Sequence, residues 1–194
     1  MLDEALSRRG FLRAAGSVAG AAGLAALWPA VLAAAQGAAT ARDAAAPFET
    51  LTADEAADLA AIAAQIIPSD ALPGATEAGV VYFIDGSLRT FMAGARESVL
   101  SGLAALNRKA AAAQAGARFA ALPPEGQVAL LKAEEATPFF GTVHFMTVAG
   151  MFALPVYGGN RDYAGWKLLG FEHRMAWLPP FGHYDAPAPA GKAK

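Results

Sequence analysis

The chain has 194 residues and a formal net charge of −2 at pH 7, with 55% hydrophobic and 16% charged residues. This composition excludes a disordered chain, which combines low hydrophobicity with high net charge, and the length fits one ordinary domain. No basic field exists to attract phosphates, so nucleic acid is not expected as a partner. The sequence contains no cysteine, which excludes disulfides, thiolate-bound iron–sulfur clusters, c-type haem attachment and a cysteine nucleophile.

The first 35 residues have the order of an export signal: a charged start, an apolar run over 14–32 and a small-residue cleavage site at 33–35. The stretch 7–13 resembles the twin-arginine signal of bacteria, whose route carries folded proteins. Its expected signal residues are Arg8, Arg9, Phe11 and Leu12. We therefore expect the twin-arginine translocase to export the chain to the periplasm. The alternative is an uncleaved membrane anchor, because the run is about long enough to span a bilayer, although only weakly hydrophobic.

Beyond the leader, the pattern predicts an all-α domain of about five helices over residues 51–185. Residues 36–50 are expected to be a flexible lead-in, and residues 186–194 a disordered tail. A capping box of Thr52 and Glu55 starts the first helix, which Pro68 ends. Further helices are expected at 77–91, at 98–115, from Pro124 onward, and after a Thr137 cap, where the apolar side chains from Phe139 to Val148 are expected inside or nearly so.

Residues 151–184 differ in character, because they are dense in glycine, proline and aromatic side chains. Linkers lack aromatics, so this segment is expected to be ordered and irregular, with a short helix near residues 164–169. The patterns of common catalytic sites are missing: the histidines lack the H-x-x-x-H spacing, no G-x-S-x-G elbow occurs, and Glu134 and Glu135 are helix neighbours that point in different directions. We expect no catalytic, cofactor-binding or metal-binding residue in this chain.

The run over residues 155–171 reads PVYGGNRDYAGWKLLGF. It resembles the signature of the gluconate 2-dehydrogenase subunit 3 family, in which a Phe-rich helix, here with Phe139 and Phe140, leads into P-x-Y-G-G-N-R-D-x-x-G-W-K-x-x-G-F. The twin-arginine leader and the helix that starts after Thr52 also fit the family. One departure is the sequence Glu-His-Arg at 172–174, where family members often continue with Pro-Gly.

The resemblance implies an accessory role without catalytic chemistry. Such small subunits accompany a large flavoprotein, similar to the glucose-methanol-choline oxidoreductases, that carries FAD and oxidises a sugar, polyol or sugar acid. A cytochrome c subunit often receives the electrons. The small subunit is implied to escort the flavoprotein through twin-arginine export and to stabilise it.

The signature segment offers residue types that dominate interface hot spots, namely tyrosine, tryptophan and arginine. The candidate partner-interface residues are Tyr157, Asn160, Arg161, Asp162, Trp166, Phe171 and His183. His183 is further expected to contribute to the pocket edge of the flavoprotein. An equal alternative is an intramolecular lid, in which the aromatics pack on the helices. A third possibility is an independent periplasmic sugar-binding protein or enzyme that uses residues 151–184 as its pocket.

Overall fold

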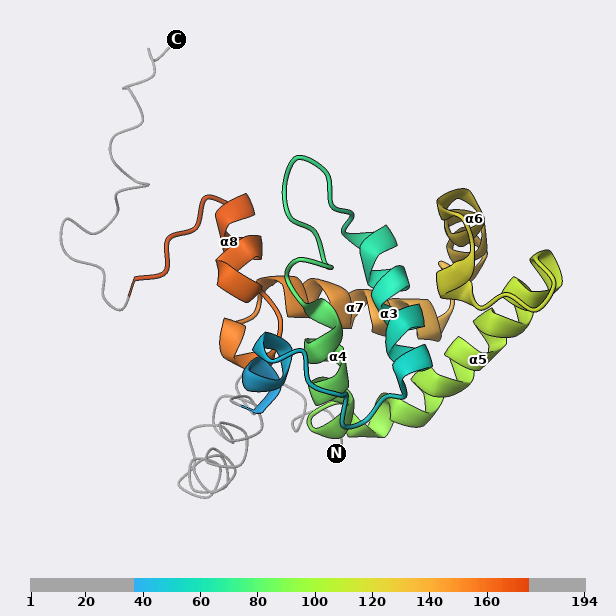
Figure 1. Cartoon of the computed structure of the whole chain (residues 1–194), viewed down its shortest axis with the longest axis horizontal. Coiled ribbons are helices and arrows are strands. Elements are labelled where there is room, and N and C mark those ends of the chain that lie inside the picture. The colour runs from blue at the N-terminus through green and yellow to red at the C-terminus, as the bar shows by residue number, and fades with distance from the viewer. Residues whose placement is uncertain (1–36, 175–194) are drawn as a thin grey trace, which may run out of the picture.

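The computed structural model describes residues 37–174, and within that range it contains seven helices and no strand (Figure 1). The predicted all-α fold is confirmed. Residues 37–43 are helical, and the labelled helices are α3 (Ala53–Ile66), α4 (Val80–Arg89), α5 (Arg96–Ala113), α6 (Pro124–Glu134), α7 (Pro138–Phe152) and α8 (Ala164–Leu168). The expected leader at 1–35, the disordered tail at 186–194 and residues 175–185 of the predicted domain lie outside the described residues, as does His183.

Local signals place the helix ends. The Thr52 side chain accepts the Glu55 N–H at 3.2 Å, and the Glu55 carboxylate accepts the Thr52 N–H at 2.8 Å, so the predicted capping box is confirmed. Thr137 caps α7 in the same way, through the N–H of Phe140. The helix expected from residue 77 begins only at Val80, because Gly79 before it has left-handed backbone angles.

The core lies where α7 packs against α3, α4, α5 and α6, and Figure 1 shows α7 crossing behind α3 and α4. Its fully buried large side chains include Leu59, Ile62, Ile84, Leu88, Leu103, Leu106, Phe119, Val143 and Met146. Gly150 lets α7 approach α4 closely, since an added Cβ would lie only 3.0 Å from the ring of Phe83. One face of α7 therefore holds the domain together.

The sequence predicts a flexible lead-in at residues 36–50. In the structure, the described part of this segment, residues 37–50, instead packs onto the domain. After the helical residues 37–43, the chain runs along α4, where the carboxylate of Asp85 accepts the N–H groups of three successive residues, 49–51, at 3.0, 2.9 and 2.9 Å. The alanine-rich composition of this segment gave no sign of these contacts, because their partners lie elsewhere in the sequence. The segment is part of the folded domain.

Among residues 37–174, no helix is both long and apolar enough to cross a membrane.

Candidate functional site

The signature segment forms a tight loop between α7 and α8 in which the backbone repeatedly takes left-handed angles. Gly158 has a φ of 95°, Asn160 44°, Asp162 55° and Tyr163 60°. A positive φ is uncommon for a residue other than glycine, and asparagine and aspartate tolerate it best. Three such residues within four positions require surrounding contacts that hold the loop in place.

Asn160 is the centre of those contacts. Its side chain is fully buried, its Nδ2 donates to the carbonyl oxygen of Ala153 at 2.8 Å, and its Oδ1 accepts the N–H of Gly165 at 2.9 Å. Ala153 follows α7 and Gly165 lies in α8, so this one side chain ties the end of one helix to the start of the next. The role of Asn160 is therefore to hold the loop.

Two arginines fasten the lead-in to the same loop. The guanidinium of Arg42, only 5% exposed, donates to the carbonyl oxygens of Pro155 at 3.2 Å and Gly159 at 2.6 Å. Arg161 returns the contact by donating to the carbonyl oxygen of Arg42 at 2.9 Å, and its Nε lies 3.7 Å from Asp43. The hydrogen bond from Arg42 lowers the pKa of the Asp43 carboxyl, and the charges of both arginines act in the same direction. We call this arrangement the arginine clasp.

The second glycine of the signature is explained by packing. An added Cβ at Gly159 would overlap the carbonyl oxygen of Gly150, which belongs to α7, so the loop lies directly against the helix backbone. This close approach gives the Gly-Gly pair a structural purpose in the fold.

The aromatic residues of the segment gather around Trp166. Its Nε1 donates to the carbonyl oxygen of Phe152 at 2.7 Å, which fastens α8 to the end of α7. The ring centroid of Trp166 lies 5.3 Å from that of Tyr163, 5.2 Å from that of Phe171 and 5.1 Å from that of His173. We call these four residues the aromatic cluster. Trp166 is half-buried, whereas the other three side chains remain exposed to solvent.

The structure thus separates the predicted interface residues into those that bond within the chain and those that are exposed or half-buried. The polar side-chain groups of Asn160, Arg161 and Trp166 form hydrogen bonds within the chain, as the lid alternative expects. Asp162 and Phe171 are exposed, and Tyr157 is half-buried. For these residues, contact with a partner stays a prediction.

A second surface was missed by the sequence analysis, which expected the apolar side chains of α7 inside or nearly so. Val143 and Met146 are indeed fully buried, but Phe145 is 53% exposed and Val148 is 36% exposed. Farther along the chain lie Phe152, which is half-buried and also packs against the core, and the exposed Leu154, which follows the end of the helix. Phe145, Val148 and Phe152 follow one another at helical spacings of three and four, and Leu154 lies two residues beyond the end of α7. We call Phe145, Val148, Phe152 and Leu154 the α7 ridge.

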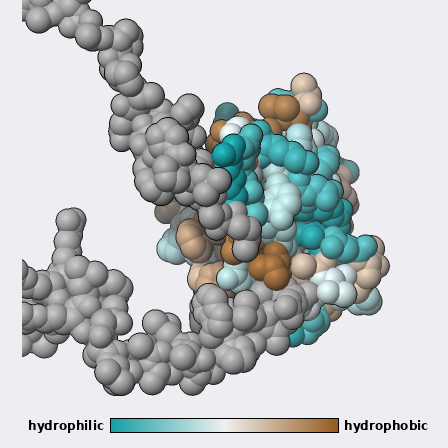
Figure 2. Space-filling model, turned by 90° about the vertical axis from the view of Figure 1, so that its left-hand side faces the viewer, coloured by the Kyte–Doolittle hydropathy of each residue, from teal (hydrophilic) through white to brown (hydrophobic). Residues whose placement is uncertain are grey.

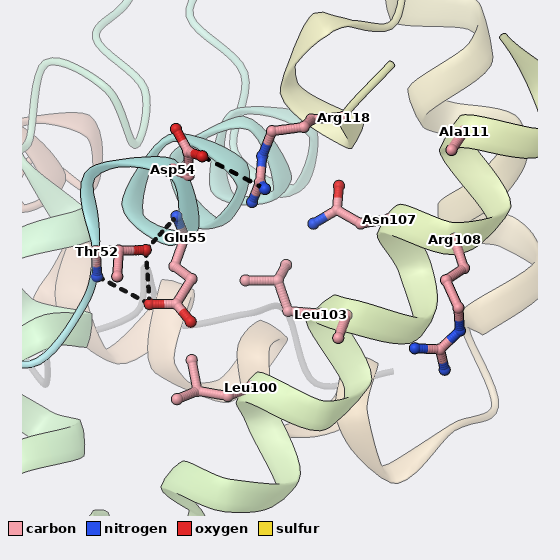
Figure 3. Close-up of a pocket in the computed structure, with 10 residues that line it drawn as sticks. Thr52, Asp54, Glu55, Leu100, Leu103, Asn107, Arg108, Ala111 and Arg118 are labelled. Atoms are coloured by element: carbon pink, nitrogen blue, oxygen red, sulfur yellow. Dashed lines mark hydrogen bonds and ion pairs between the residues drawn. The ribbon is translucent and has the colours of Figure 1, made fainter. Parts of the chain in front are cut away.

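A shallow pocket of about 510 Å³ lies between the start of α3 and α5, away from the signature segment (Figure 3). Two of its polar side chains are already bound: Arg118 pairs with the fully buried Asp58, and Asn107 donates to the same carboxylate at 2.7 Å. Arg108 extends from α5 apart from this network. Since these groups serve the fold and none of the described residues 151–174 lines the pocket, it gives no support to the sugar-site alternative.

Within the described part of the chain, no three His, Cys, Asp or Glu side chains come together in a group that could hold a metal ion. His144 lies on the outer side of α7, with its ring centroid 6.0 Å from that of Phe140. His173 belongs to the aromatic cluster. The described histidines are thus found among aromatic side chains.

The comparisons with known proteins agree with this geometry. A family model described as gluconate 2-dehydrogenase subunit 3 matches residues 53–172, which run from the start of α3 past the signature segment. Comparisons with curated proteins and with solved structures gave no match. The matched range covers more than half of the chain. The chain therefore belongs to the gluconate 2-dehydrogenase subunit 3 family.

Proposed function

We propose that this chain is the non-catalytic small subunit of a periplasmic, FAD-dependent sugar or sugar-acid dehydrogenase. In this proposal a large subunit, similar to the glucose-methanol-choline oxidoreductases, holds the FAD and the substrate. A cytochrome c subunit that accepts the electrons is compatible with the same assembly. The small subunit escorts the large one through twin-arginine export and stabilises it.

The family match over residues 53–172 carries this proposal, because a subunit 3 domain indicates an accessory subunit of a multi-subunit dehydrogenase complex. The geometry of the signature segment supports it. The polar side chains of Asn160 and Arg161 are engaged in holding the fold, whereas Tyr163, Leu169 and Phe171 are large hydrophobic side chains that the segment exposes beside two charged ones. Such a surface suits contact with another protein better than chemistry on a small polar substrate.

The arginine clasp supports the export part of the proposal. Residues 37–43 directly follow the expected leader, and Arg42 joins them to the signature loop more than a hundred residues later in the chain. The leader is therefore attached to a segment that docks only when the domain has folded. A route that carries folded proteins matches this arrangement.

A leader variant tests the escort role. The large subunit would be produced together with this chain in either native form or as the double variant Arg8→Lys, Arg9→Lys, and dye-linked sugar dehydrogenase activity would be measured in the periplasm and the cytoplasm. Native signal should place the activity in the periplasm, and the double variant should retain it in the cytoplasm. Arg13→Lys is the matched control, because it changes a leader arginine outside the pair. Equal periplasmic activity with both leaders would contradict the escort role.

A further inference from the structure

We infer that the α7 ridge is the surface on which the large subunit docks, and that this subunit presents an apolar, uncharged face to it. The inference rests on the proposed function, which supplies the partner. It goes further by naming the contact surface and its chemistry.

The first observation is the absence of charge along the ridge. Residues 136–160 contain no Asp, Glu, Lys or Arg, and they include all of α7. The outward sides of α5 and α6, in contrast, carry exposed charged residues such as Lys109 and Lys132. A helix that is apolar all round is normally buried, whereas a surface helix has a polar outer face. Apart from His144, the exposed positions of α7, which include Phe145 and Val148, therefore have the composition of a buried surface.

The second observation is the solvent exposure of two apolar side chains on this face. Phe145 is 53% exposed and Val148 is 36% exposed, one turn apart on the same side of α7. Large exposed apolar patches mark interaction sites, and charged residues are depleted at the centre of interfaces. An uncharged ridge fits an uncharged partner face, because a charged group placed against it would lose its water without gaining a partner.

The third observation is that the ridge continues into the aromatic cluster. Phe152 belongs to the ridge, its carbonyl oxygen accepts the Nε1 hydrogen of Trp166, and its ring lies against Gly165 of α8. The cluster adds exposed Tyr163 and Phe171 side chains, of a residue class favoured at interfaces. Seen from the end that carries α8, the described surface shows separate hydrophobic patches among hydrophilic side chains (Figure 2).

Residues 172–174 leave the domain beside the aromatic cluster, where His173 lies against Tyr163 and Trp166. The ridge and the aromatic cluster thus meet at Phe152, and the exposed ion pair of Glu172 and Arg174 follows the cluster. Membership of a multi-subunit complex supplies a partner for them, and this favours the large subunit over a second copy of this chain.

Two matched valines test the inference. Val148 on the ridge is 36% exposed and Val128 on α6 is 37% exposed, so aspartate at either position points a charge outward without entering the core. Full-length chains carrying Val148→Asp or Val128→Asp would be produced with a tagged large subunit, and the amount of small subunit captured would be measured. Val148→Asp should reduce capture about tenfold or more, as loss of a central contact does, and Val128→Asp should leave it unchanged. Circular dichroism of both variants checks that each is folded.

The outcomes separate this inference from the proposed function. If the native chain is not captured by the large subunit, the proposed function fails, and the inference fails with it. If the native chain and Val148→Asp are captured equally, only the inference fails. It is also overturned if Val148→Asp abolishes self-association of the isolated chain without changing capture, because the ridge would then serve a second copy. A last outcome would show that the chain covers its own ridge. In that case the uncomplexed chain binds more hydrophobic dye when residues 175–194 are removed, and the large subunit still captures Val148→Asp as well as the native chain.

Discussion

Among the residues of the signature loop, Asn160 is the one whose replacement should lower the free energy of unfolding most. Asn160→Ala removes the donor to Ala153 and the acceptor for the N–H of Gly165, and it leaves an alanine at a φ of 44°. The side chain is fully buried, so water cannot easily replace either hydrogen bond. We expect α8 to keep only the Trp166 hydrogen bond as its polar attachment to the end of α7, and to loosen before the core is disturbed.

The magnitude follows from three contributions. Leaving the buried N–H of Gly165 without an acceptor costs about 1–3 kcal/mol, and the half-buried carbonyl of Ala153 adds about 1 kcal/mol. Alanine in the left-handed region costs about 1 kcal/mol more. The free energy of unfolding should therefore fall by about 3–5 kcal/mol, which is a large share of the stability of an ordinary domain.

Urea denaturation followed by circular dichroism measures this change, and the chain offers a matched control. Asp162 also has a left-handed backbone, with a φ of 55°, but it is exposed and its side chain has no hydrogen bond or ion pair among residues 37–174. Asp162→Ala should therefore cost only the backbone part, about 1 kcal/mol. Equal losses for the two variants, or a loss below about 1 kcal/mol for Asn160→Ala, would refute the bridging role assigned to Asn160.

Three further changes test the loop, helix α7 and the clasp. Gly159→Ala places a Cβ against the carbonyl of Gly150, so the denaturation midpoint should fall sharply; a midpoint within error of the native one would contradict this packing. Gly141→Ala, at an exposed helical site with open space around it, should stabilise the isolated chain by about 0.5–1 kcal/mol in the same assay, and a loss would speak against the helix assignment there. The lowered pKa of Asp43 means that its stabilising contribution is present above its ordinary value near 4 and is lost as the pH falls through the lower folded value. Urea titrations across that acid range should therefore show a smaller pH dependence for Asp43→Asn than for the native chain, and identical pH profiles would argue against the clasp.

The features that the sequence predicted correctly are local ones. The Thr52 capping box, the Thr137 cap and the end of the first helix before Pro68 each depend on residues within a few positions of one another. The short helix expected near residues 164–169 is observed at Ala164–Leu168 for the same reason. Local hydrogen bonds and proline geometry fix such features before any tertiary contact forms.

The features that the sequence did not predict depend on distant contacts. The lead-in is held by Asp85 and Arg161, so nothing in its own alanine-rich composition indicates order. The outer face of α7 was missed for a different reason. Apolar residues surround the whole helix, so periodicity cannot distinguish the side of Val143, which is buried, from that of Phe145, which is exposed. Among the predicted interface residues, Asn160 fits an internal role because asparagine tolerates left-handed geometry, and this property was visible in the sequence.

Native mass spectrometry of the assembly captured through a tag on this chain is the most direct test of its membership in a dehydrogenase complex. The sample would be purified from cells that produce the chain at its natural level, and its absorbance spectrum would be recorded before the measurement. We predict a mass that contains this chain together with a larger flavin-binding subunit, in a sample that oxidises a sugar or sugar acid with an added dye. A colourless sample with the mass of this chain alone would contradict the accessory-subunit function.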